Sequence, residues 1–296
     1  MRLLFLVLAM LFSLVSFSQG RKRHRHVTNE KGAIYISWGY NRSAYTKSDI
    51  RFQGQGYNFN TQYAKARDNQ SSLSSGDYSL TSLSVPQYNF KIGYYYKNKW
   101  SIALGIDHMK YVFLDQNKVV LSGSLSYSNQ STYIGSHIAY GSAILLSKNI
   151  TTVRDSFHFE NAQGLNYIHA ELGLAENIYT ADKKGDFKVM SNVGFGAGCL
   201  LSYTSLYYNQ VQSPITRSLS GYGLSTFAGL RFEAFKRVYL YTNLSVGFLH
   251  KVHEKTSTVD QVAYVTQYFG YSQIEAGLGL FLFRRANNGC DSCPVW

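Results

Sequence analysis

The sequence predicts a closed, antiparallel β-barrel that crosses a membrane. Among its 296 residues are 25 Tyr, 18 Phe and 25 Gly but only 3 Pro, a mixture that favours strands over helices. Beyond the N-terminal segment, no stretch stays apolar for the roughly 18 residues that a membrane-spanning helix requires. Apolar and polar residues alternate instead, in segments about as long as a tilted transmembrane strand.

Eight segments show this alternation, and an even number of strands puts both ends of the chain on the same side of the membrane. A weaker alternation at 119–127 and 157–161 is interpreted as strands that extend past the membrane, and a ten-stranded barrel is the alternative. The eight segments are 33–41, 87–96, 101–112, 165–174, 187–203, 221–234, 238–250 and 271–283.

The connections between these segments alternate in length. Three are short and polar: KNK at 97–99, ADKKGD at 181–186 and FKR at 235–237. The others are long and cover about 42–86, 113–164, 204–220 and 251–270. Short turns on one side and long loops on the other predict a barrel with periplasmic turns and external loops.

The N-terminal residues predict export from the cytoplasm. Arg2 is followed by an apolar run from Leu3 to Val15 and by the small-x-small sequence of Ser16, Phe17 and Ser18, which is typical of a signal peptide. We therefore expect a signal peptide at 1–18, a basic periplasmic segment at 19–32, the barrel at 33–283 and a periplasmic tail at 284–296. The expected location is the outer membrane of a Gram-negative cell envelope.

The architecture over 33–283 resembles small outer-membrane barrels of the OmpA and OmpX kind, and the lipid A deacylase PagL shares that architecture. The resemblance implies the fold and matches no specific motif. The last strand ends in Phe281, Leu282 and Phe283, similar to the aromatic-ended strand that barrel-assembly machinery reads, although 13 further residues follow it.

Side chains on a strand alternate between lipid and lumen. In 101–112 the even-numbered Ile102 and Leu104 are apolar, so the sequence predicts that they face lipid and that Asp107 faces the lumen. His108 and Lys110 continue the lipid face. We expect them at the outer rim, in contact with lipid headgroups.

The same alternation predicts a polar network in the lumen. Eight strands enclose a space that their own side chains fill, so we interpret the network as a polar plug, with a narrow proton or ion path as the alternative. Its ionisable members are Lys91, Asp107, His169, Glu171, Arg231, Glu233 and Glu275.

The formal net charge of +12 indicates an anionic partner. For an exported chain, outer-membrane lipid and lipopolysaccharide fit better than nucleic acid. Three Cys, at 199, 290 and 293, are too few for a disulfide scaffold, and CDSC at 290–293 lacks the His of a haem-attachment site. We expect no cofactor, and the only candidate metal pair is His24 and His26 in the basic leader.

The sequence thus favours a non-enzymatic outer-membrane barrel whose surface loops bind a partner or a glycan. Alternatives are a narrow ion channel and a lipid A acyl hydrolase, which needs a nucleophile and a base at the outer rim. The His-x-Ser spacing of the deacylase is missing. The nearest candidates are Ser156-x-His158, His158-x-Glu160 and His169-x-Glu171.

Overall fold

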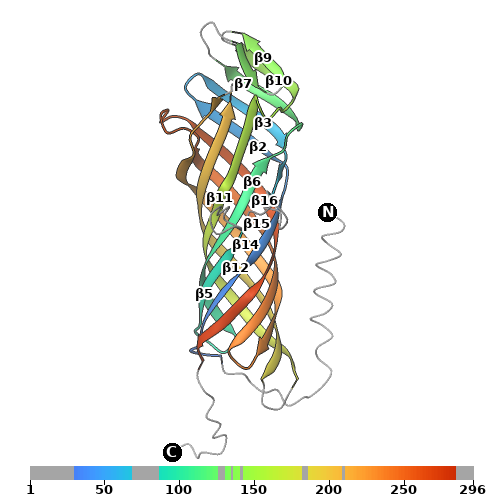
Figure 1. Cartoon of the computed structure of the whole chain (residues 1–296), viewed down its shortest axis with the longest axis vertical. Helices are drawn as coiled ribbons and strands as arrows, with labels where there is room; N and C mark the ends of the chain where they lie inside the picture. The colour runs from blue at the N-terminus through green and yellow to red at the C-terminus, as the bar shows by residue number, and fades with distance from the viewer. Residues whose placement is uncertain are drawn as a thin grey trace, which may run out of the picture.

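The computed structural model describes residues 30–68, 87–125, 131–134, 136–140, 143–181, 186–208 and 211–284. Eight antiparallel strands form a closed ring, because the first and the last of them pair with each other (Figure 1). In ring order these are β1 (Ile34–Tyr45), β5 (Asn89–Tyr95), β6 (Trp100–Phe113), β11 (Phe157–Thr180), β12 (Phe187–Tyr208), β14 (Thr216–Ala234), β15 (Val238–Lys255) and β16 (Tyr264–Phe283).

The predicted fold class is confirmed, with eight strands in the ring instead of ten. Ile34 of β1 pairs with Phe283 of β16, so the barrel begins and ends at one end, where the short turns also lie. We call this the turn end and the opposite one the loop end. No helix in the described part of the chain is long and apolar enough to cross a membrane.

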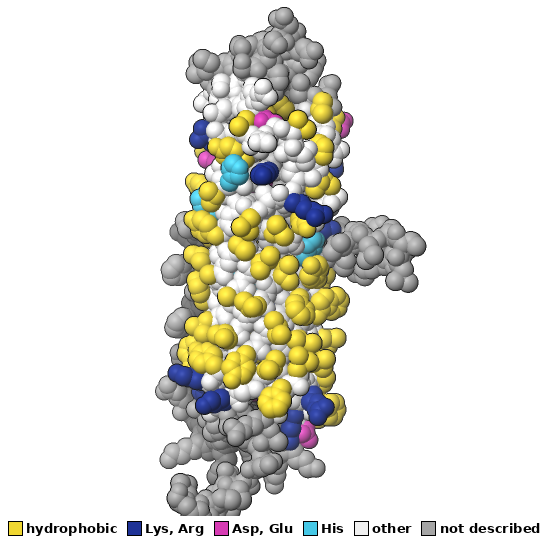
Figure 2. All heavy atoms as spheres, turned by 90° about the vertical axis from the view of Figure 1, so that its left-hand side faces the viewer, with side chains coloured by type: hydrophobic (Ala, Val, Ile, Leu, Met, Phe, Trp, Pro, Cys, Tyr) yellow, Lys and Arg dark blue, Asp and Glu magenta, His cyan; other side chains and the backbone are white. Residues whose placement is uncertain are grey.

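The strands are longer than a bilayer requires. β11 has 24 residues and β12 has 22, whereas about 9–11 suffice for a tilted strand to cross a bilayer. Exposed apolar side chains form a band around the turn-end part of the barrel, and basic side chains and His gather at its upper edge (Figure 2). The barrel therefore has a lipid-compatible section and an extension beyond it.

Additional strands build this extension at the loop end. A sheet continues from β16 through β2 (Ser48–Gly54), β3 (Tyr57–Ala64) and β7 (Lys118–Leu125) to β10 (Ala143–Thr151). The alternation at 119–127 and 157–161 thus corresponds to β7 and to the start of β11. Three smaller pieces complete the extension: β4 (Ala66–Arg67) on β6, β13 (Val211–Gln212) on β12, and a hairpin of β8 (Ser131–Ile134) and β9 (His137–Tyr140).

Bulges in β11, β14 and β15 interrupt the alternation near the start of the extension. In β15 the register shifts between Lys251 and Glu254, and in β11 it shifts between Asn161 and Leu165. A bulge inserts extra residues into one strand and so changes which face a side chain occupies. As a result Lys251 and Glu254, three positions apart, are both buried.

Tyrosine and glycine form complementary pairs inside the turn-end half. Gly93 lies opposite Tyr35 on the neighbouring strand, and Gly279 lies opposite Tyr239. A Cβ at either glycine would collide with the tyrosine ring. The ring therefore lies flat over the glycine and fills lumen space, which explains why a chain so rich in tyrosine is also rich in glycine.

Several expectations lie outside the described residues. They are the signal peptide at 1–18, most of the basic segment at 19–32, the pair His24 and His26, and the tail with Cys290 and Cys293. The described Cys199 is a free thiol of intermediate exposure.

Candidate functional site

A cluster of charged side chains fills the middle of the lumen. Lys91 on β5 places its Nζ 2.8 Å from Oε1 of Glu171 on β11 and 3.3 Å from Oε2 of Glu275 on β16. All three side chains are buried. An ammonium between two carboxylates joins strands from opposite parts of the ring, so this contact braces the barrel across its interior.

His169 extends the cluster towards β6. Its Nε2 lies 3.3 Å from Oδ2 of Asp107, and its Nδ1 lies 3.3 Å from Oε1 of Glu171. The ring stacks on Tyr167, with the two centroids 4.6 Å apart. The structure therefore brings Lys91, Asp107, His169, Glu171 and Glu275 into one continuous network.

Glu275 is the most heavily bonded member. Its carboxylate accepts hydrogen bonds from the side chains of Asn89 at 2.9 Å, Gln273 at 3.0 Å and Ser245 at 3.1 Å, besides the contact with Lys91. A buried carboxylate is tolerated when it is paired and hydrogen-bonded in this way.

The remaining predicted members, Arg231 and Glu233, form a separate group at the turn end. The guanidinium of Arg231 lies 2.6 Å from Oε1 of Glu233 and 3.5 Å from Oε2 of Glu30. Arg284 closes the group, 2.6 Å from Glu30 and 3.0 Å from Glu233. Glu30 precedes β1 and Arg284 follows β16, so this quartet ties together the two ends of the barrel chain.

Aromatic rings enclose Arg231. Its guanidinium lies 5.7 Å from the ring centroid of Tyr95, 5.4 Å from that of Tyr239 and 5.3 Å from that of Phe281. Between this group and the central cluster is a cavity of about 60 Å³, lined in part by Lys91, Glu171 and Arg231. A space of that size holds a few water molecules at most.

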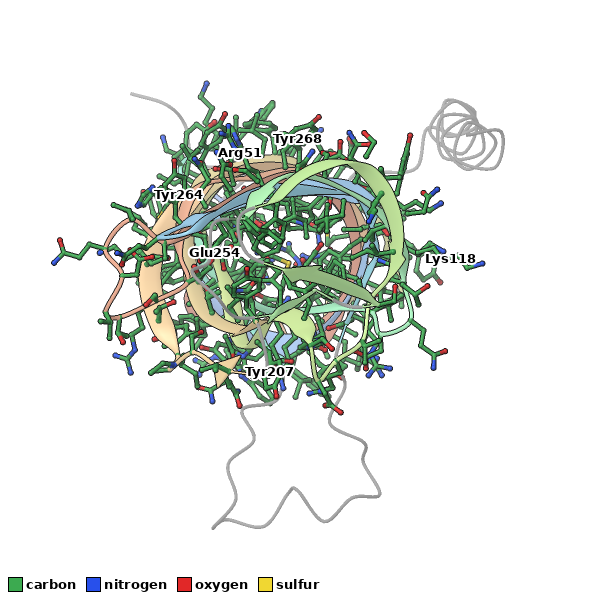
Figure 3. All side chains as sticks on the ribbon, turned by 90° about the horizontal axis from the view of Figure 1, so that it is seen from above. Arg51, Lys118, Tyr207, Glu254, Tyr264 and Tyr268 are labelled. Carbon is green, nitrogen blue, oxygen red and sulfur yellow. The ribbon has the colours of Figure 1, made fainter. Side chains whose placement is uncertain are left out.

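A third polar group occupies the loop end. Lys251 on β15 places its Nζ 2.9 Å from Oε2 of Glu254 and 2.6 Å from Oδ1 of Asn161. The same ammonium lies 4.8 Å from the ring centroid of Tyr111 and 5.0 Å from that of Phe159. Figure 3 shows Glu254 inside the barrel wall as seen from the loop end.

The sequence did not single out Glu30, Arg284, Lys251 or Glu254. Glu30 and Arg284 lie just outside the first and last strands, where alternation does not predict whether a side chain points inward or outward. The last two lie on either side of the bulge, and strict alternation would place one of them outside. The sequence gives one sign of the pair formed by Lys251 and Glu254. A charged residue is followed three positions later by one of opposite charge, in a segment at the end of a predicted strand.

His108 and Lys110 differ from the expectation that they are exposed at the rim, because both are buried. Tyr88 stacks on the ring of His108 at 5.2 Å, and the side chain of Asn166 lies 2.7 Å from its Nδ1. The bulge of β11 presses against the same ring, since a Cβ at Gly164 would lie 2.7 Å from it. Neighbouring chain thus covers the outward face of β6 at this height.

The residues considered for a hydrolase do not form one group, because the pair of His169 and Glu171 and the pair of His158 and Glu160 lie at different places in the barrel. His169 is in the lumen. His158 is buried near the start of β11, with Nε2 3.1 Å from Glu160 and Nδ1 3.5 Å from Asp115. The hydrogen bond with His158 holds the pKa of Glu160 below its usual value. Among the described residues, no group of His, Cys, Asp and Glu is arranged to hold a metal ion.

The chain matches no protein-family model and no curated protein sequence. Among solved structures it is similar to the outer membrane protein OprG from Pseudomonas aeruginosa, with a TM-score of 0.39 and 10% identity over 86% of this chain and 98% of that one. It is also similar to Ail, the attachment invasion locus protein of Yersinia pestis, with a TM-score of 0.29 and 11% identity over 84% and 99% of the two chains. The outer membrane protease OmpT from Escherichia coli gives a TM-score of 0.33 and 10% identity over 87% and 99%. At these scores nothing about activity or partners follows from the likeness.

Proposed function

We propose that this chain is a non-conducting outer-membrane barrel that anchors a rigid surface extension, and that the extension binds a partner or a glycan. The band of exposed apolar side chains is what a bilayer requires of a barrel wall. Closure of the ring leaves no unpaired strand edge in that band. The predicted signal peptide adds a route for export from the cytoplasm.

The observation that carries the proposal is the filled interior. Buried ionic groups occur at three successive levels, around Arg231, Lys91 and Lys251, and each cation has a carboxylate partner. Tightly packed aromatic rings surround the first and the last of these groups. An ion crossing the barrel would have to break all three, so the plug favours an anchor over a channel.

The extension shares a continuous core with the barrel. Phe52 of β2 packs against Phe157 and Phe159 of β11, with ring centroids 5.1 Å and 5.6 Å apart. Phe59 of β3 joins the same cluster. Packing of this density makes the extension a rigid platform, and binding to a rigid platform costs little ordering entropy.

Conductance in planar lipid bilayers tests the plug. The purified chain, refolded and inserted at known density, is expected to add no current steps above those of the lipid alone. A general porin in the same bilayers provides the positive control. Discrete current steps whose number increases with the number of inserted barrels would overturn the anchor hypothesis and support a narrow channel.

Membrane location is tested separately. After fractionation of cells, the chain is expected in the outer-membrane fraction. Boiled and unboiled samples should migrate differently on a gel, because a closed barrel resists detergent until it is heated. A chain found in the soluble periplasmic fraction, or one whose mobility is insensitive to boiling, would contradict the proposal.

A further inference from the structure

We propose that a basic and aromatic patch on the outer wall of the barrel binds the phosphorylated sugars of lipopolysaccharide. This rests on the proposed outer-membrane location. The patch, called the rim patch below, lies on four adjacent strands, β14, β15, β16 and β2. Its exposed or half-exposed side chains are Arg51, Arg217, His253, Lys255, Tyr264 and Tyr268.

Strand pairing brings most of these residues to similar heights on one side of the barrel, and Tyr268 lies four positions closer to the turn end than Tyr264 on β16. Lys255 is the cross-strand partner of Tyr264, and Arg51 is the partner of Thr266, two positions further along β16. Viewed from the loop end, Arg51, Tyr264 and Tyr268 lie on the same side of the wall (Figure 3). Arg217 follows on the next strand, where Thr216 donates a hydrogen bond to the carbonyl of Lys255.

The rim patch begins where the apolar band ends. On β14, Arg217 lies two positions from Leu219, which is 69% exposed. On β15, His253 follows Val252, which is 47% exposed. The basic side chains therefore lie at the height of the headgroups when the band is immersed in hydrocarbon. Figure 2 shows Lys, Arg and His side chains at this upper edge of the band.

The cations of the rim patch have no carboxylate partner within the described residues. Arg51 contacts the amide oxygen of Asn58 at 3.3 Å, and Arg217 stacks over the ring of Tyr203 at 5.1 Å. Two acids lie close by in the sequence, and backbone groups occupy both. Asp49 accepts from the amide of Tyr63, and Asp260 accepts from the amides of Gln55 and Val262.

At the turn end, Lys99 pairs with Glu176 at 2.9 Å and Lys236 pairs with Asp186 at 3.4 Å, although the exposed Lys97 and Arg237 form no ion pair within the described residues. The loop end is distinguished by grouping, because Arg51, Arg217 and Lys255 lie on neighbouring strands beside aromatic rings. Guanidinium groups bind phosphate through paired hydrogen bonds, which makes phosphate the best fit for Arg51 and Arg217.

Aromatic side chains favour a sugar phosphate over a simple phospholipid headgroup. His253 and Tyr264 stack with centroids 4.3 Å apart, and Tyr268, which lies four positions further along β16 and is 58% exposed, packs against His250. Such amphipathic rings present a flat apolar face with a polar edge. A phosphorylated sugar offers both a flat face and anionic groups, and the outer leaflet of the outer membrane supplies it in lipopolysaccharide.

Binding of a short-core lipopolysaccharide to the full chain in detergent tests the rim patch. We compare the unaltered chain with the triple variant Arg51→Gln, Arg217→Gln, Lys255→Gln. The expected loss of affinity is on the order of 100-fold, since each cation near an anionic surface contributes roughly fivefold. The matched control is Lys99→Gln with Lys236→Gln at the turn end, which should bind like the unaltered chain.

Three further arms identify the ligand. Lipopolysaccharide stripped of its phosphates should bind far more weakly, phosphatidylglycerol in mixed detergent micelles should compete poorly, and inorganic phosphate should compete only at high concentration. Equal affinity of the triple variant and the unaltered chain, or equal binding of phosphatidylglycerol, would overturn the rim patch. Heat-dependent gel mobility shows that each variant is folded. A chain that binds lipopolysaccharide in this assay but fractionates away from the outer membrane would disprove the proposed location and leave the rim patch standing.

Discussion

Lys251 and Glu254 form an ion pair that is closed off from solvent at the loop end of the barrel. Nζ lies 2.9 Å from Oε2, and both side chains are 0% exposed. The bulge in β15 turns the two side chains to the same face, and Asn161 bonds to both of them. This pair, ringed by aromatic side chains, closes the interior on the loop side.

Breaking this pair should strongly destabilise the barrel. Glu254→Ala leaves a buried ammonium without its carboxylate, and the expected cost is about 3–5 kcal/mol. The double variant Lys251→Met, Glu254→Leu removes both charges and should recover most of that loss. Urea unfolding in detergent micelles measures both, with Lys255→Ala at an exposed neighbouring position as control. A single variant as mild as the control would show that the pair contributes little.

Glu275 should be the least replaceable member of the central cluster. Glu275→Ala leaves Lys91 with one carboxylate and strips several buried amide and hydroxyl donors of their acceptor. Each unsatisfied buried donor costs about 1–3 kcal/mol, so we expect the variant to fail to reach the heat-modifiable form. Glu275→Gln keeps an acceptor and should assemble with lowered stability. Similar yields of folded protein from Glu275→Ala and Ser245→Ala would contradict this.

The quartet at the turn end should act as a latch between the chain ends. Arg284→Gln removes the charged contacts to Glu30 and Glu233, and we expect a loss of about 1.5–3 kcal/mol. Lys236→Gln, which removes an exposed pair with Asp186, should cost at most about 1 kcal/mol. The temperature at which the folded gel band disappears compares the two. Equal temperatures would mean that the latch does not hold the ends.

Glu160 predicts a dependence of stability on pH. Its hydrogen bond with His158 lowers the pKa of the carboxyl in the folded state. The stabilisation is therefore fully present above the unfolded pKa, about 4.3, and is lost as the pH falls through the lower folded value. The difference in melting temperature between the unaltered chain and Glu160→Gln should shrink between neutral pH and pH values below about 4. Glu176→Gln, which removes an exposed ion pair with Lys99, serves as the reference variant. If the difference in melting temperature between the unaltered chain and Glu160→Gln grows on acidification, the pKa of Glu160 is not lowered in the folded state.

The orientation of the barrel can be read from two engineered thiols. In a background without the three native cysteines, Val259→Cys lies at the loop end, where Val259 is 88% exposed, and Asn98→Cys lies in the turn between β5 and β6. An impermeant maleimide added to intact cells should label Val259→Cys and spare Asn98→Cys. Both should react once the outer membrane is opened. The opposite pattern would place the chain ends outside.

The sequence alone predicted the ring of eight strands, because alternation with period two is a local property that survives in any closed barrel. The same reasoning gave the inward direction of Lys91, Asp107, His169, Glu171 and Glu275, whose strands have no register shift at those positions. It could not tell that Arg231 and Glu233 belong to a different group, since that depends on how far up the barrel each strand is staggered.

Alternation alone could not predict that His108 and Lys110 are buried. Alternation predicts a lipid face for both residues, but Tyr88 and the bulge at Gly164 cover the ring of His108.

Local patterning thus determined that this chain forms a barrel and, away from the bulges, which side chains enter it. Only the tertiary structure decided which charges meet, because pairing depends on stagger and on bulges that no single strand encodes. It also decided which cations remain unpaired. That is why the rim patch emerges from Arg51, Arg217 and Lys255, which lie far apart in the sequence and side by side on the wall.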